Sequence, residues 1–529
     1  MTDTGGQAEY LDEGVETKTD NRKRAIVLGG VVATAAVIGG AAWAATSFFA
    51  TGAQPAEALP ASTTVAYASI DLDPSGSQKI EAIRTLRKFP GLEEEMNFDA
   101  DDDLREQLFA ELTESGECEG LDFERDIDPW LGSRAAMAGV EGADGEVVPV
   151  GVIQVTDPGK AEDGMANFVR VCGGDDEDAS AETGPWIIEG DWLVVGEDHE
   201  AVEGVVEAAG EGSLADDDEF TRWTGEAGDP GILSVYVAAG AAAHFDDVFA
   251  SSGMFFGPAT MAGDPSMTGA IEDFEGMAMT VRFDDGALEI ESAASANQQM
   301  QEFFASTVGM DLVASLPEDT VAALGMGLKD GWVDAIAEQI ATAEGEDTTV
   351  EDLYAEASEA TGLDLPTDLE KLFGEGMTVA LGDGIDADAL ANGGVLELPI
   401  GVKIKGDPDD VRSVLDKIEP QLGPDEQGLL ESAASDDHVA MSPDDAFREE
   451  LAEDGSLGDN EVFEDLVDDS GDAQAVLFVN FNADDDWLVR VADDIDPTVA
   501  ENLAPLSALG VSSWFDDGVG HGVVRLTTD

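Results

Sequence analysis

The chain has 529 residues, 43% of them hydrophobic, so it is long enough for more than one domain and apolar enough to bury a core. Its 116 acidic residues stand against 24 lysines and arginines, which gives a formal net charge of −92. Because nucleic-acid binding depends on lysine and arginine to neutralise phosphates, this balance excludes a nucleic-acid-binding protein. Two cysteines and four histidines leave little material for a disulfide-dense scaffold or a zinc cluster.

The first 50 residues predict a tail followed by a membrane span. Residues 1–24 are polar and acidic, and we expect a disordered cytoplasmic tail. Residues 25–50 carry no charge and would extend about 39 Å as a helix, enough to cross the lipid bilayer. Since the basic residues precede this span, we expect a plasma-membrane protein with a linker at 51–58 and residues 59–529 on the extracellular side.

A cleaved signal peptide is the alternative interpretation of the same segment. Small residues at 42–44 or 53–58 could supply its cleavage site. The 24 residues ahead of the apolar segment are long and acidic for the start of a signal peptide. This length and charge favour the uncleaved transmembrane helix.

Five segments recur in type and in the same order later in the chain. The matched pairs are 59–73 with 316–330, 120–140 with 362–382, 148–158 with 398–408, 212–220 with 455–463, and 283–286 with 515–518. Their offsets stay between 232 and 257 residues, and five ordered matches are hard to obtain by chance. We therefore predict an internal duplication, with a first unit at 59–300 and a second at 310–529.

Each predicted unit mixes strands with helices. Residues 65–71 alternate in hydropathy like a half-buried strand, and residues 78–89 place their apolar side chains on one helical face. Residues 186–196 and 277–293 each have the pattern of two strands around a tight turn. These features predict an α+β fold of two tandem copies of one mixed, largely antiparallel sheet-plus-helices domain, preceded by the single transmembrane helix.

The segment 71–76 resembles the start of a calcium loop. Asp71, Asp73 and Ser75 match the D-x-D-x-S-G beginning of such a loop, whose ligands are carboxylate and other oxygen atoms. The bidentate glutamate that should follow is replaced by Ala82. A turn that caps the next helix is therefore the favoured interpretation, and a calcium ion at these three residues is the alternative. No other cofactor is predicted.

The two cysteines, Cys118 and Cys172, both lie in the first unit. Their aligned positions in the second unit hold Ala360 and Leu422, so both cysteines are missing there together. In an extracellular compartment a disulfide is the default state of such a pair, and closing a loop of about 55 residues would contribute roughly 4 kcal/mol. We predict the Cys118–Cys172 disulfide, with two separate buried thiols as the alternative.

No catalytic motif is complete in the sequence. His199 and Glu200 begin a pattern like the HExxH zinc helix, but Glu203 replaces the second histidine. Gly325 and Gly327 belong to a loose glycine-rich pattern that the first unit does not share. No GxSxG elbow and no phosphate loop occurs, so we predict no catalytic residue. Four tryptophans could line a sugar site but have apolar neighbours typical of a core, and they are Trp130, Trp186, Trp192 and Trp223.

The paired LP…V…DLDPSG…QKI pattern, the RDIDPWLGSRAA segment and the single N-terminal span resemble an actinobacterial membrane-anchored cell-envelope family. That family is catalogued only as a domain of unknown function. The resemblance covers most of the chain after residue 50 and implies an anchored envelope protein. It supplies no catalytic residue.

The expected function is that of a non-catalytic binding or scaffold module, held in the lipid bilayer by residues 25–50, for an unknown envelope component or solute. Its ligand would occupy a cleft between the two units. One alternative is an envelope hydrolase whose site is built from scattered acids, and another is a calcium-stabilised surface protein. A pocket of acids with raised pKa values would favour the hydrolase.

Overall fold

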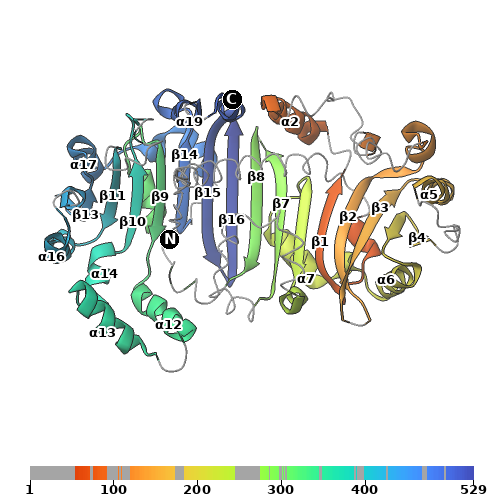
Figure 1. The fold of residues 1–529 in the computed structure, drawn as a ribbon, viewed down its shortest axis with the longest axis horizontal. Helices are drawn as coiled ribbons and strands as arrows, with labels where there is room; N and C mark the ends of the chain where they lie inside the picture. The colour runs from red at the N-terminus through yellow and green to blue at the C-terminus, as the bar shows by residue number, and fades with distance from the viewer. Residues whose placement is uncertain are drawn as a thin grey trace, which may run out of the picture.

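A single antiparallel sheet of 16 strands forms the centre of the molecule (Figure 1). The computed structural model describes residues 54–71, 76–91, 105–106, 109, 120–143, 145–172, 184–244, 274–284, 286–296, 301, 303, 307–344, 348–386, 389, 398–423, 427–467, 473–493 and 496–529. Across the sheet the strands follow the order β12-β13-β11-β10-β9-β14-β15-β16-β8-β7-β6-β1-β2-β3-β5-β4.

The strands of the first half of the sheet are β1 Thr64–Asp71, β2 Leu131–Glu141, β3 Val147–Val155, β4 Trp186–Glu189, β5 Trp192–Val195, β6 Leu233–Ala238, β7 Gly276–Asp284 and β8 Ala287–Ser295. Those of the second half are β9 Ala322–Gly327, β10 Gly376–Leu381, β11 Ile400–Lys405, β12 Ser432–Ala434, β13 His438–Met441, β14 Ala475–Asn480, β15 Leu506–Asp516 and β16 Val519–Thr528.

The prediction of two separate tandem domains is wrong. Strands β8 and β16 pair with each other in antiparallel register from Val519 opposite Ser295 to Thr527 opposite Ala287. Each of these strands would otherwise be an edge strand with unpaired backbone groups, and their pairing satisfies both edges at once. The two halves therefore share one continuous sheet.

The strand order is the same in both directions away from the β8–β16 pair. Toward one edge it is β8-β7-β6-β1-β2-β3-β5-β4, and toward the other it is β16-β15-β14-β9-β10-β11-β13-β12. The five pairs of similar sequence segments lie on corresponding elements: residues 59–73 include β1, for example, and residues 316–330 include β9. The halves thus repeat one topology on either side of the β8–β16 pairing, which we call the seam.

Helices cover both faces of the sheet, as the clusters around β6 show. Tyr236 lies in a cluster with Phe220 of α7, whereas the alternate residues Val235 and Val237 lie in a second cluster with residues of α2, α19 and α20. The helices are α2 Gly76–Leu86, α5 Pro158–Cys172, α6 His199–Glu211, α7 Asp218–Glu226, α11 Val308–Ala314, α12 Trp332–Glu344, α13 Val350–Thr361, α14 Thr367–Phe373, α16 Pro408–Ile418, α17 Asp445–Ala452, α18 Glu461–Val467, α19 Ala483–Asp493 and α20 Pro497–Leu503.

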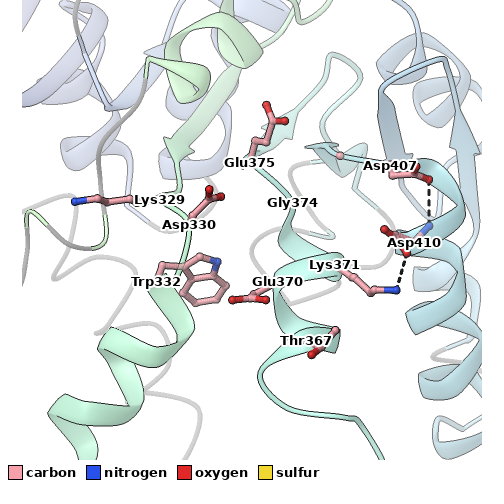
Figure 2. A pocket seen from close by; sticks show the side chains of 12 residues that line it. Lys329, Asp330, Trp332, Thr367, Glu370, Lys371, Gly374, Glu375, Asp407 and Asp410 are labelled. Carbon is pink, nitrogen blue, oxygen red and sulfur yellow. Dashed lines mark hydrogen bonds and ion pairs between the residues drawn. The ribbon is translucent and has the colours of Figure 1, made fainter.

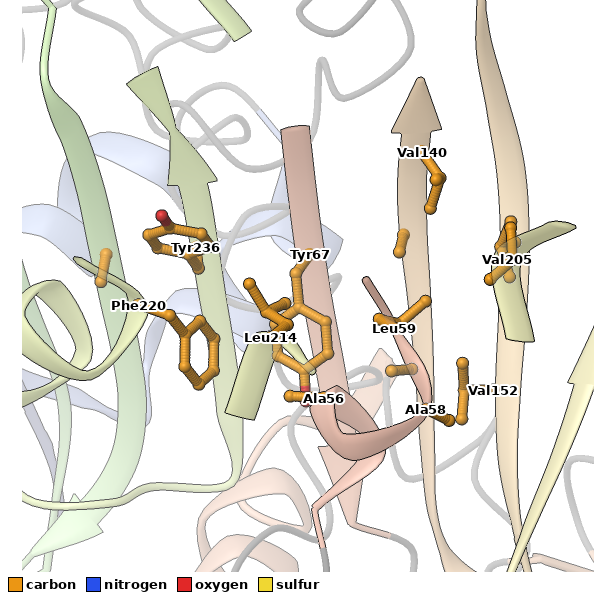
Figure 3. Close-up of a cluster of buried hydrophobic side chains, with 14 of the residues drawn as sticks. Ala56, Ala58, Leu59, Tyr67, Val140, Val152, Val205, Leu214, Phe220 and Tyr236 are labelled. Atoms are coloured by element: carbon orange, nitrogen blue, oxygen red, sulfur yellow. The ribbon is translucent and has the colours of Figure 1, made fainter. Parts of the chain in front are cut away.

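Aromatic side chains fill the core of the first half between the sheet and α7 (Figure 3). Phe220 packs edge-on against Tyr67 of β1, with ring centroids 5.6 Å apart, and against Tyr236 of β6 at 5.1 Å. Edge-to-face pairs of this kind contribute about 1 kcal/mol each beyond the burial of their area. They hold α7 on the face of the sheet opposite α2 and α19.

The prediction of a transmembrane helix and of a plasma-membrane location is corrected. None of the helices in the described segments combines the length and the apolar character that a bilayer crossing requires. The longest of them, α5, has 15 residues, whereas a span needs about 20. The predicted span at 25–50, with its tail and most of the linker, lies outside the described residues.

The predicted disulfide receives no support either. Cys118 lies outside the described residues, and although Cys172 is the last residue of α5, its side chain is not described. No disulfide bond is present among the residues that the structure describes.

Candidate functional site

The calcium prediction falls largely outside the described residues. Asp71 is the last residue of β1, where its backbone pairs with Arg134 of β2, but Asp73 and Ser75 lie beyond the described part. Within the described segments, no three His, Cys, Asp or Glu side chains are grouped so that they could hold a metal ion. Calcium at Asp71, Asp73 and Ser75 therefore stays an untested prediction.

The incomplete HExxH pattern forms the first turn of α6. His199 begins this helix, and its Nδ1 atom lies 3.0 Å from the carbonyl oxygen of Gly184. The carboxylate of Asp198 caps the helix by accepting a hydrogen bond of 2.9 Å from the amide of Ala201. These contacts position the start of the helix.

The glycine-rich pattern serves helix packing. A β-carbon on Gly325 would lie 2.5 Å from the carbonyl oxygen of Gly309 in α11, and one on Gly309 would lie 2.7 Å from the backbone nitrogen of Gly327. Side chains at these positions would therefore push α11 away from β9. The four tryptophans suspected of lining a sugar site are buried in the core, and they are Trp130, Trp186, Trp192 and Trp223.

A cavity of about 420 Å³ lies in the second half, where three connections meet at one end of the strands (Figure 2). The segment after β9 leads into α12, the segment after α14 leads into β10, and the segment after β11 leads into α16. Because these strands are antiparallel neighbours, the three connections emerge at the same end of the sheet. The lining residues are Lys329, Asp330, Gly331, Trp332, Thr367, Glu370, Lys371, Gly374, Glu375, Gly406, Asp407 and Asp410.

Two of the positive features at the cavity, the start of α16 and the ammonium of Lys371, already have hydrogen-bond partners. The amides at the start of α16 donate hydrogen bonds to Asp407, from Asp409 at 2.9 Å and from Asp410 at 3.3 Å. Lys371 donates a hydrogen bond of 2.6 Å to the carboxylate of Asp410, which raises the pKa of Lys371 above its ordinary value. Figure 2 shows the ammonium of Lys329 directed away from the other labelled side chains.

Three carboxylates at the cavity remain without a charged partner. Asp330, Glu370 and Glu375 form no ion pair with another described residue. Trp332 lies beside Glu370 (Figure 2) and packs edge-on against Phe373, with ring centroids 5.5 Å apart. The cavity therefore combines excess negative charge with an aromatic ring.

Hydrogen bonds hold the α14 wall of the cavity in place. Asp368 accepts a hydrogen bond of 2.6 Å from the amide of Asp364 and two from the ammonium of Lys417, at 2.6 and 2.7 Å. Burial opposes ionisation of Asp368, but these donors outweigh it and hold its pKa below the ordinary value. Opposite this wall, the hydroxyl of Tyr354 donates a hydrogen bond of 2.7 Å to Asp334 and ties α13 to α12.

In the first half, an arginine occupies the place that corresponds to the surroundings of Glu370 in the second half. The loop before β2 matches the loop before β10, since Asp126 accepts a hydrogen bond from the amide of Asp122 just as Asp368 accepts one from Asp364. Two residues beyond Asp126 stands Asp128, the counterpart of Glu370. Asp128 accepts a hydrogen bond of 2.9 Å from Nη2 of Arg105.

The same guanidinium makes a second contact there. Nη1 of Arg105 donates a hydrogen bond of 2.8 Å to the carbonyl oxygen of Leu131, the counterpart of Phe373. Arg105 belongs to the connection between β1 and β2, and the corresponding connection of the second half supplies Trp332. One connection thus places a guanidinium in the site, whereas the other places an aromatic ring at the side of a cavity.

Sequence reasoning missed this cavity because its residues come from three separate segments in a chain where acids are everywhere. A usable signal lay in the differences between the matched segments. Glu375 and Asp410 stand where the first unit has Ser133 and Lys160. The two changes add negative charge at one place. The expected cleft between two units is also corrected, because the halves join edge to edge through β8 and β16.

Comparison with known proteins gives a family and no function. The sequence model of a family described as "Protein of unknown function (DUF3352)" matches residues 26–382. The match spans the first half and continues to the end of β10, so it includes the cavity residues from Lys329 to Glu375. No curated protein and no solved structure matches the chain.

Proposed function

The chain belongs to the DUF3352 family of proteins of unknown function, and we propose that it is a non-catalytic binding module for a small organic cation. The observation that carries the proposal is the cavity, in which three carboxylates form no ion pair with any residue that the structure describes. Its volume of about 420 Å³ falls within the range of small-molecule sites.

The charges at the cavity favour a cation over an anion. Two lysines stand against five carboxylates among the lining residues, a net charge of −3. The start of α16, which would attract an anion, already has its amides bonded to Asp407. Lys371 is engaged by Asp410. An anionic ligand would thus meet excess carboxylates with few free donors to offset them.

The chemistry of the lining residues favours an organic cation and simple binding. Although the cavity has five carboxylates, no three of the described acidic side chains are grouped closely enough to hold a metal ion. The face of Trp332 can attract an organic cation, an interaction that contributes about 0.5–2 kcal/mol. The lining residues include no histidine, serine or cysteine, so the nucleophile–base pairs common in hydrolases are absent from the cavity.

Calorimetric titration of the purified protein tests this proposal. Butylammonium, butylguanidinium and neutral valeramide have similar size and differ in charge. We expect at least one cation to bind with a stoichiometry of one, and valeramide not to bind. Glu370→Gln should weaken the binding about tenfold, which corresponds to about 1.4 kcal/mol for a charge-assisted contact.

A matched variant distinguishes the effect of a carboxylate at the cavity from the effect of the overall negative charge. Glu356 is an exposed residue of α13 that does not line the cavity, and Glu356→Gln removes one negative charge from the same half. This variant should leave the affinity unchanged. Equal weakening by Glu356→Gln and Glu370→Gln, or no binding of either cation, would overturn the proposed function.

A further inference from the structure

In the first half, one arginine side chain makes a pair of hydrogen bonds next to β2. The guanidinium of Arg105 uses two different nitrogens, Nη2 toward the carboxylate of Asp128 and Nη1 toward the carbonyl oxygen of Leu131, at 2.9 and 2.8 Å. A planar fork of donors suits this arrangement of two acceptors. The side chain of Arg105 is 20% exposed, so the site is well filled.

The carboxylate acceptor recurs in the second half, and the arginine does not. Glu370 takes the position of Asp128 and lines the cavity, whereas Phe373, the counterpart of Leu131, is not among the lining residues. No described arginine forms an ion pair with Glu370, and the connection that supplies Arg105 in the first half supplies Trp332 here. What differs between the halves is therefore the cationic group itself.

We propose that the second-half cavity binds a guanidinium group supplied by a ligand, in the place that Arg105 fills in the first half. This inference rests on the proposed function and specifies its ligand class. The group can belong to free arginine or a similar small guanidine compound, or to an arginine side chain of a peptide.

The other side chains at the cavity fit a guanidinium better than an ammonium. A guanidinium is flat and weakly hydrated, so it can stack on the face of Trp332 while its edge donates to Glu370. Glu375 replaces Ser133 of the first half and adds a second acceptor at the cavity. An ammonium is a compact, strongly hydrated point charge, and it gains less from an aromatic face and from acceptors that are spread apart.

The test compares two cations of equal charge on the full chain. We expect butylguanidinium to bind at least tenfold more tightly than butylammonium in calorimetric titrations at low salt. Glu370→Gln should lower the affinity for butylguanidinium about tenfold and largely remove the preference between the two probes. Trp332→Leu should also reduce the preference, because it removes the stacking surface and keeps the charges. A thermal melt of each variant establishes that it is folded.

The outcomes separate this inference from the proposed function. Equal or tighter binding of butylammonium would overturn the guanidinium assignment and leave a cation site. Binding of neither cation would overturn both. A further pair of probes identifies the source of the group. If L-arginine binds and N-acetyl-L-argininamide does not, the ligand is a free small molecule, and the reverse result indicates a peptide arginine; both results support a guanidinium site.

Discussion

The two halves of the sheet share one strand order and fill the same positions with different chemistry. On β7 and β8 of the first half, Arg282 and Glu289 face each other as an ion pair. The matching positions on β15 and β16 hold Trp514 and His521, whose rings stack with centroids 5.1 Å apart. A common backbone topology therefore does not fix the side-chain interactions that stabilise it, and each half has specialised separately.

A second contrast between the halves lies where β2 pairs with β3 in the first half and β10 pairs with β11 in the second. Val152 of β3 pairs with Ala136 of β2 inside the apolar core of the first half. In the second half the counterpart of Ala136 is Thr378 of β10, which pairs with Lys403 of β11, and both of these residues are fully buried. The second half thus holds buried polar groups, and next to α14 a cavity, where the first half holds apolar side chains and Arg105.

The largest expected difference in stability between matching substitutions lies at the seam between β8 and β16. Glu289 is 1% exposed and accepts a hydrogen bond of 2.6 Å from Nε of Arg525 in addition to its contact with Arg282. Glu289→Ala should lower the free energy of unfolding by about 3–5 kcal/mol, because it removes a buried carboxylate that Arg282 and Arg525 share. His521→Ala, at the matching position, should cost only about 1 kcal/mol. Urea unfolding followed by tryptophan fluorescence measures both, and similar losses would break the contrast.

A second comparison concerns the buried lysine. The ammonium of Lys403 donates hydrogen bonds of 3.0 Å to the carbonyl oxygens of Ser315 and Glu453. Lys403→Ala should cost about 3 kcal/mol, since it leaves two carbonyls without their donor and opens a cavity. Val152→Ala should cost about 1–2 kcal/mol, because only apolar contacts are lost. An equal loss in the two variants would show that the buried polar contacts contribute nothing extra.

The pH dependence sharpens that comparison. Burial lowers the pKa of Lys403 below its ordinary value of 10.5, so the unfolded chain binds more protons than the folded protein just below that pH. The stability of the parent protein relative to Lys403→Met should therefore rise as the pH increases toward 10.5 and then level off. A difference that falls over this range in parallel urea titrations would contradict the buried position of the ammonium.

The smallest effect on stability belongs to Arg105. Its ion pair with Asp128 is partly exposed, so Arg105→Ala should cost no more than about 1 kcal/mol. The variant should nevertheless change the stoichiometry of butylguanidinium binding from one to two per chain, because the carboxylate of Asp128 and the carbonyl oxygen of Leu131 then lack the guanidinium that they bind in the parent protein. Arg105→Lys serves as the control, since it keeps a cation in place. A stoichiometry that stays at one in Arg105→Ala would show that the two places are not equivalent.

The local pattern of the sequence was sufficient to predict individual elements. The strands Trp186–Glu189 and Trp192–Val195 form the tight hairpin expected there, with Gly190 in the left-handed conformation that such a turn requires. The strands of segment 277–293 likewise pair around Gly286. The periodicity of residues 78–89 predicted the helix found at Gly76–Leu86.

Long-range association could not be predicted in the same way. The alternation of apolar and polar residues in β8 and in β16 shows which face of each strand is buried. It does not show which other strand pairs with each of them. The pairing of these two strands is what turns the duplicated segments into one sheet. The cavity was hidden for a related reason, since Lys329, Glu370 and Asp410 meet only after the strands between them have paired.

The most direct test of the account is a crystal structure of the full chain with butylguanidinium present. We predict that the guanidinium lies in the second-half cavity, with its nitrogens within hydrogen-bond distance of Glu370 and its plane against Trp332. The corresponding place in the first half should still hold Arg105. A guanidinium bound elsewhere at saturating concentration, with the cavity beside Glu370 free of it, would contradict the central claim.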